Sequence, residues 1–197
     1  MELMGIISNR RESGKWEIVR SQKKSLPRLR SVSKQKQKPK ERISMKARMN
    51  HYEVNPKAYE TMLGLEKFST SSGLDHTLYE LIKIRASQIN GCAFCLDMHT
   101  EALLKVSGNE RRIHLISVWR ESPFFTEAER AALELTEAVT LISDGGVPQS
   151  LYERVREHFD EKQYVALIMA IVTINGWNRL AISTGMFPGC LDPQSGK

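Results

Sequence analysis

The stretch E-L-I-K-I-R-A-S-Q-I-N-G-C-A-F-C-L-D-M-H, residues 80–99, holds two cysteines, a histidine and a glutamate. Its first half has apolar residues recurring at helical spacing. Asn90-Gly91 follows, and both residues tolerate the left-handed backbone conformation that ends helices. A second helical pattern begins at about Cys92. The stretch therefore predicts two helices joined by a tight turn, with the reactive side chains divided between them.

The chain from about residue 50 onward shows the same helical periodicity almost throughout. Asn55 is a suitable N-cap, and Pro56 suits the first helical position because its missing N–H costs nothing there. Thr126-Glu-Ala-Glu129 is a capping box. We expect an all-α fold of about six to seven helices. The expected ranges are one from Pro56, then about 78–89, 92–106, 113–119, 126–142, 151–159 and 161–183.

The composition predicts one globular domain. The chain has 197 residues, of which 41% are hydrophobic and 26% are charged. Its longest apolar run, residues 165–174, is shorter than the roughly 20 residues that cross a bilayer, so we expect a buried core helix and no membrane partner. Three cysteines and no visible secretory signal argue against a disulfide framework. We expect a cytoplasmic protein, in which a close cysteine pair indicates catalysis or metal binding.

The positive charge lies at the N-terminus. Residues 1–44 hold 13 Lys and Arg against 4 Asp and Glu, a net +9, so the total of +6 leaves −3 for the rest. The segment lacks periodicity, and its composition predicts a disordered extension. A basic arm would bind nucleic acid or an anionic membrane. A wrongly chosen start codon would also explain it, with Met45 or Met49 as the natural start. We expect an extension without a role, and no nucleic-acid partner.

The two cysteines and the histidine have a spacing that suits thiol chemistry. In a helix over 92–106, Cys92, Cys95 and His99 stand at i, i+3 and i+7, on one face. Cys92 falls in the first turn, where unpaired N–H groups and the helix dipole stabilise a thiolate. The thiolate is the reactive form of cysteine. The spacing also lets the sulfurs approach bonding distance, and His99 can exchange a proton near neutral pH.

Glu80 lies on the preceding helix, about three turns before the Asn90-Gly91 break. Because antiparallel helices joined by a tight turn bring such positions opposite each other, Glu80 is expected to face the stripe of Cys92, Cys95 and His99. Its negative charge raises the pKa of a thiol, so it does not serve as a simple ion-pair partner. A role as a proton acceptor in a relay fits better.

Two other interpretations of the cysteine pair stay open. Cys92, Cys95 and His99 are legitimate zinc ligands, and Glu80 would have to be the fourth, since no second C-x-x-C or H-x-x-x-H pair occurs. The pair would also suit a small redox partner without peroxide chemistry. Cys190 lies far away near the C-terminus, where we expect a free thiol.

A family resemblance adds to these observations. Glu80, eleven intervening residues and C-A-F-C-L-D-M-H resemble the E-x11-C-x-x-C-x-x-x-H signature of the alkyl hydroperoxidase D (AhpD-like) branch of the carboxymuconolactone decarboxylase family. M-K-A-R-M-N through M-L-G-L-E-K-F is similar to the start of such proteins, and I-N-G-W-N-R-L-A-I to their closing helix. The resemblance covers roughly residues 45–189, which leaves 190–197 as a tail. It implies an all-helical fold, commonly oligomeric, and thiol-dependent reduction of hydroperoxides.

The resemblance also implies roles for the residues. Cys95 would be the attacking thiol and Cys92 the resolving one, while Glu80 and His99 would form the proton relay. No metal, flavin or haem is required. The expected partners are a small hydroperoxide, a dithiol reductant and further copies of the chain. Phe94 stands where the best-studied peroxidases of the family have a second histidine, which makes the site more apolar. The decarboxylase branch lacks the cysteine pair, so we do not expect lactone decarboxylation.

Overall fold

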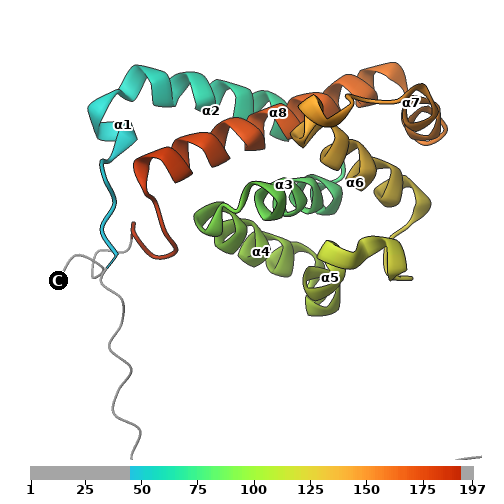
Figure 1. Ribbon diagram of the computed structural model, residues 1–197, viewed down its shortest axis with the longest axis horizontal. Helices are drawn as coiled ribbons and strands as arrows, with labels where there is room; N and C mark the ends of the chain where they lie inside the picture. Colours follow the sequence, from blue (N-terminus) through green and yellow to red (C-terminus); the bar gives the residue numbers. More distant parts are fainter. Residues whose placement is uncertain (1–44, 192–197) are drawn as a thin grey trace, which may run out of the picture. The chain divides into compact units, whose positions relative to one another are not determined.

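The computed structural model describes residues 45–191, and these form eight α-helices and two 3₁₀ helices without a strand (Figure 1). In chain order they are α1 (His51–Val54), α2 (Pro56–Thr70), α3 (His76–Asn90), α4 (Ala93–Ser107), α5 (Glu110–Leu115), η1 (Ile116–Glu121), α6 (Glu127–Thr140), η2 (Ile142–Asp144), α7 (Gln149–Arg156) and α8 (Glu161–Thr184). The predicted all-α fold is confirmed. The additional α-helix is the single turn α1. The expected extension over 1–44 lies outside the described residues.

The helix starts follow the predicted capping signals. The Asn55 side chain accepts a hydrogen bond from the N–H of Ala58 at 3.1 Å, and Pro56 occupies the first position of α2. At α6, the Thr126 side chain accepts from the Glu129 N–H while the Glu129 carboxylate accepts from the Thr126 N–H. Each cap satisfies N–H groups that the helix itself leaves without a partner.

The segment predicted as one helix over 113–119 is divided. The α-helix ends at Leu115 and continues as the 3₁₀ helix η1, with Val118 out of helical geometry at φ −122° and ψ 33°. Side chains three residues apart lie on the same side of a 3₁₀ helix, so Ile116 and Trp119 both point into the core. The segment ends before Pro123, which disfavours a helical residue at the position before it.

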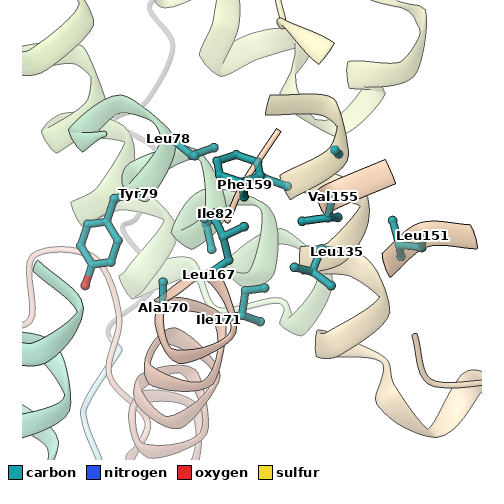
Figure 2. Close-up of a cluster of buried hydrophobic side chains, with 12 residues drawn as sticks. Leu78, Tyr79, Ile82, Leu135, Leu151, Val155, Phe159, Leu167, Ala170 and Ile171 are labelled. Carbon is teal, nitrogen blue, oxygen red and sulfur yellow. The ribbon is translucent and has the colours of Figure 1, made fainter. Parts of the chain in front are cut away.

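Helix α3 is the centre of the packing, because it contacts α4, α6 and α8. Figure 2 shows the largest cluster of buried apolar side chains, which α3 forms with α6, α7, Phe159 and α8. Its members are Leu78, Tyr79, Ile82, Ala131, Ala132, Leu135, Leu151, Val155, Phe159, Leu167, Ala170 and Ile171. Burying one such Leu or Ile contributes about 1.5–3 kcal/mol. The cluster therefore anchors α3, which carries part of the candidate site.

Helix α8 is longer than the apolar run that predicted it. By length and composition, its 24 residues would suffice to cross a membrane, but half of the apolar window is buried inside the protein. It runs alongside α2 (Figure 1) and also contacts α3 and α6. It also buries Thr173 and Asn178. This packing is that of a core helix.

The turn between α3 and α4 requires a glycine at residue 91. Gly91 has φ +69° and ψ 30°, and a Cβ atom added there would meet nothing within 4 Å. The cost of a side chain is therefore one of backbone conformation alone. We expect Gly91→Ala to lower the free energy of unfolding by about 1–2 kcal/mol, measured by urea denaturation.

Gly64 is the matched control, since it lies inside α2 and an added Cβ also meets nothing within 4 Å. There an alanine is expected to raise the free energy of unfolding by about 0.5–1 kcal/mol. Equal effects of the two substitutions would show that the left-handed turn is not a requirement of the fold.

Candidate active site

The two cysteines lie at the start of α4. Cys92 is the N-cap residue, with the extended dihedrals φ −88° and ψ 92°, and Cys95 lies in the first turn. The prediction that Cys92 belongs to that first turn is corrected by one residue, because the left-handed Gly91 is followed by an extended residue before α4 begins. The N–H of Cys92 donates to the Ser87 carbonyl at 3.0 Å, which ties the turn back to α3.

Both cysteines are free thiols, and both are buried. Cys92 is 2% exposed and Cys95 is 1% exposed. They lie in one apolar cluster where α3, α4, α8 and the residue after Gly185 meet. The other members of this cluster are Ala86, Phe94, Ile174, Trp177, Ala181 and Met186. The sulfur atoms are therefore shielded from water in the resting protein.

The two thiols have opposite pKa shifts. The Cys95 thiol lowers the pKa of Cys92 to about 7, and the N–H groups of Cys95 and Phe94 and the Asn178 amide act in the same direction against burial. The pKa of Cys95 is raised, first by Cys92 and then by burial. A helix N-terminus is a favourable place for a thiolate. As the pH rises through about 7 the pair therefore loses one proton, and Cys92 is favoured over Cys95 as the thiolate.

Glu80 and His99 meet inside the protein. The Nδ1 atom of His99 lies 2.8 Å from Oε2 of Glu80, and both side chains are 8% exposed. A carboxylate only accepts hydrogen bonds, so Nδ1 carries the hydrogen and Nε2 is left as the atom that exchanges protons. This contact joins α3 to α4, as the antiparallel arrangement predicts. It supplies a buried base and the carboxylate that orients it.

A second charge pair, which the sequence analysis did not identify, adjoins the site, with Lys83 buried and Glu66 half-buried. Lys83 is 3% exposed, its Nζ lies 2.5 Å from Oε1 of Glu66, and it lies 3.9 Å from the centre of the Tyr79 ring. Trp177 donates to the other Glu66 oxygen at 3.1 Å. Burial would raise the pKa of Glu66, but Lys83 and these neighbours lower it. The signal was the E-L-I-K spacing, which places Lys83 one turn from Glu80.

Asn178 was also missed. It is fully buried on α8, its Oδ1 accepts from Asn90 at 2.8 Å, and its Nδ2 donates to Ser87 Oγ at 3.0 Å. The only sequence signal is an asparagine on the apolar side of a helical pattern. Its two partners belong to α3, and no local pattern relates them to α8.

The zinc hypothesis finds no support in the geometry of the donors. Within residues 45–191, no group of three or more His, Cys, Asp or Glu side chains is placed to hold a metal ion. Cys92, Cys95 and His99 are thus not arranged as a ligand set in the described residues. Cys190 is a half-buried free thiol.

Comparison with known proteins identifies relatives across the described domain. Residues 56–138 match the model of the carboxymuconolactone decarboxylase family. The uncharacterized protein YdfG of Bacillus subtilis is 48% identical over 141 residues, which cover 72% of this chain and 96% of YdfG. The alkyl hydroperoxide reductase AhpD of Koribacter versatilis is 40% identical over 68 residues, 34% of each chain.

A solved structure agrees with these relatives. It is that of ATU0492 from Agrobacterium tumefaciens, a protein of unknown function with a proposed AhpD antioxidant-defence role. ATU0492 is 44% identical, has a TM-score of 0.70, and the match covers 73% of this chain and 99% of that one. The all-helical fold of the described residues is therefore AhpD-like. The chain belongs to the carboxymuconolactone decarboxylase family. This membership suggests a peroxidase-related or antioxidant role.

The shifted pKa of Cys92 predicts a thiolate signal near neutral pH. Since that pKa is lowered from 9.0 to about 7, the thiolate forms as the pH rises through about 7 and is lost as the pH falls below it. We expect the ultraviolet thiolate absorbance to show this step in Cys190→Ser, which keeps the pair, and to lose it in Cys92→Ser/Cys190→Ser. A signal that appears only near the ordinary pKa of a thiol would contradict the arrangement.

Proposed function

We propose that the protein is a thiol-dependent oxidoreductase that reduces hydroperoxides through Cys92 and Cys95, with Glu80 and His99 as a proton relay. The observation that carries this proposal is the buried contact of His99 with Glu80 at 2.8 Å, one turn along α4 from Cys95. A purely structural cysteine pair has no need of a buried base beside it. The suggested antioxidant role of the family supports the same chemistry.

The first step reduces the peroxide. Cys95 is the attacking thiol by family resemblance, and in the resting protein it still carries its proton. The Cys92 thiolate accepts this proton while the Cys95 sulfur attacks the O–O bond. An S–O bond forms and the O–O bond breaks. The leaving alkoxide takes a proton from Nε2 of His99, which receives the proton that Cys92 loses on ionising and whose positive charge Glu80 then stabilises. The products are a sulfenic acid on Cys95 and an alcohol.

The second step closes the disulfide. The Cys92 sulfur attacks the Cys95 sulfenic acid, an S–S bond forms, and the hydroxyl group leaves as water after taking the Cys92 proton. His99 is the base that transfers this proton. An external dithiol then exchanges with the disulfide, so that both thiols are restored and the donor becomes oxidised. The two cysteines carry the electrons through the whole cycle.

The test is a count of free thiols after one equivalent of an alkyl hydroperoxide is added. Wild-type protein is expected to lose two of its three thiols and to keep Cys190. A redox partner without peroxide chemistry would keep all three against the peroxide and lose two only to a disulfide donor. An unchanged count with the hydroperoxide would therefore reject the peroxidase function.

A further inference from the structure

Asn178 is held in one orientation by the fold. Its carbonyl oxygen accepts from the Asn90 side chain at 2.8 Å, and its nitrogen donates to Ser87 Oγ at 3.0 Å. Asn90 also donates to Asn175 at 2.9 Å, which ties a second point of α8 to the end of α3. Because Asn90 only donates in this contact, turning the amide of Asn178 over would lose the bond to Asn90 and set two N–H groups against each other.

The nitrogen of this amide has a second hydrogen. An Asn side chain carries two N–H donors, and the Ser87 hydroxyl uses one of them. Within the described part of the chain, no other nitrogen or oxygen acceptor contacts this nitrogen. Asn178 is 0% exposed, so bulk water does not serve the second N–H either. Leaving a buried donor without a partner costs about 1–3 kcal/mol, so such a donor calls for a function.

The thiols lie close to this amide, because Ser87, which accepts its first N–H, also accepts from the Cys92 N–H at 3.0 Å. Ile174 and Ala181, one turn before Asn178 and one turn after it, both pack in the cluster that contains Cys92 and Cys95. Asn178 lies on the same side of α8 as these two residues. The Asn178 amide also lowers the pKa of both thiols. Among the side chains, only that of the partner cysteine has a larger effect on these pKa values.

We propose that Asn178 is a catalytic hydrogen-bond donor, whose second N–H stabilises negative charge on the sulfur atoms of the Cys92–Cys95 pair. This inference deepens the proposed function, and the effect of Asn178 on peroxide reduction rests on that function. A donor that the fold has already oriented stabilises a charge without having to reorganise when that charge moves. Asn178 thus favours the ionised state of whichever sulfur holds the charge while the proton passes between them.

The test measures the thiolate absorbance against pH in a Cys190→Ser background. Asn178→Asp keeps the shape of the side chain, still accepts from Asn90, and can accept from the Ser87 hydroxyl. It replaces the N–H near the sulfurs with an oxygen. We expect the pKa of Cys92 to rise by about one unit or more, because an acceptor or a like charge disfavours the thiolate. Single-turnover oxidation by an alkyl hydroperoxide at neutral pH should slow by about tenfold.

Two variants separate this role from a structural one. Ser87→Ala removes the acceptor of the first N–H, and Asn175→Ala removes the neighbouring bond to Asn90. Asn175→Ala is expected to leave the pKa of Cys92 unchanged, and Ser87→Ala, which frees one side of the amide, to raise it by less than Asn178→Asp does. If Asn178→Asp does not fold, Asn178→Ala provides the comparison, with a smaller rise. A pKa that does not move in Asn178 variants, or moves equally in Ser87→Ala, overturns the inference. The titration needs no peroxide, so it decides the role of Asn178 even if wild type fails to reduce one.

Discussion

Cys95→Ser is expected to reduce hydroperoxide turnover by on the order of 10³-fold or more, because the covalent step loses its nucleophile. A serine hydroxyl remains protonated at neutral pH and cannot form the disulfide. The measurement is the rate of hydroperoxide loss in the presence of a small dithiol. Cys190→Ser is the matched control and should keep the wild-type rate, since Cys190 lies outside the thiol cluster.

Cys92→Ser tests the division of roles between the two thiols. If Cys95 attacks, this variant should consume at most one equivalent of peroxide and stop at a sulfenic acid, which a dimedone adduct on Cys95 would reveal by mass spectrometry. An adduct on Cys92 in Cys95→Ser, together with an unreactive Cys92→Ser, would reverse the assignment. Because the pKa of Cys92 is lowered, Cys92 is the alternative candidate for the attacking thiol.

Removing the proton relay is expected to have the second-largest effect. Glu80→Gln keeps the size of the side chain but withdraws the negative charge that supports protonated His99. We expect turnover to fall by about 10²–10⁴-fold, which is the usual contribution of general acid–base catalysis. His99→Asn should cost a similar factor, and the double variant little more, because residues that act as a unit are not additive.

An exposed Glu–Lys ion pair on α4 provides the control for the relay. Glu101 and Lys105 form an ion pair at 2.7 Å on the outside of α4, where their side chains are 68% and 71% exposed. Glu101→Gln should therefore leave turnover unchanged. If it slows turnover as much as Glu80→Gln does, or if the single and double relay variants all retain full activity, Glu80 and His99 have no part in proton transfer.

What the sequence could predict was governed by local geometry. The turn at Gly91, the capping of α2 by Asn55 and the capping box at Thr126 each depend on residues within one helical turn, and all three occur as expected. The contact of Glu80 with His99 was within reach for a related reason. A tight turn between consecutive helices fixes which positions face each other, so helical spacing alone brings the two side chains together.

The remaining parts of the site depend on contacts between distant segments. The bond of Lys83 to Glu66 joins α3 to α2, and that of Asn178 to Ser87 joins α8 to α3. Helical periodicity does not relate such positions. The pKa of Cys92 was expected to fall through the helix N-terminus, but its largest cause is the thiol of Cys95, so the direction was right and the main reason incomplete.

The burial of the sulfur atoms limits how thiol-modifying reagents can reach them. With 2% and 1% of Cys92 and Cys95 exposed, bulky alkylating agents can reach them only when the helices around them separate for a moment. Labelling of the pair would then proceed at the frequency of that breathing motion, while the half-buried Cys190 has no such gate. The rate of alkylation of Cys92 and Cys95 would thus measure the rate of local opening where α3, α4 and α8 pack together.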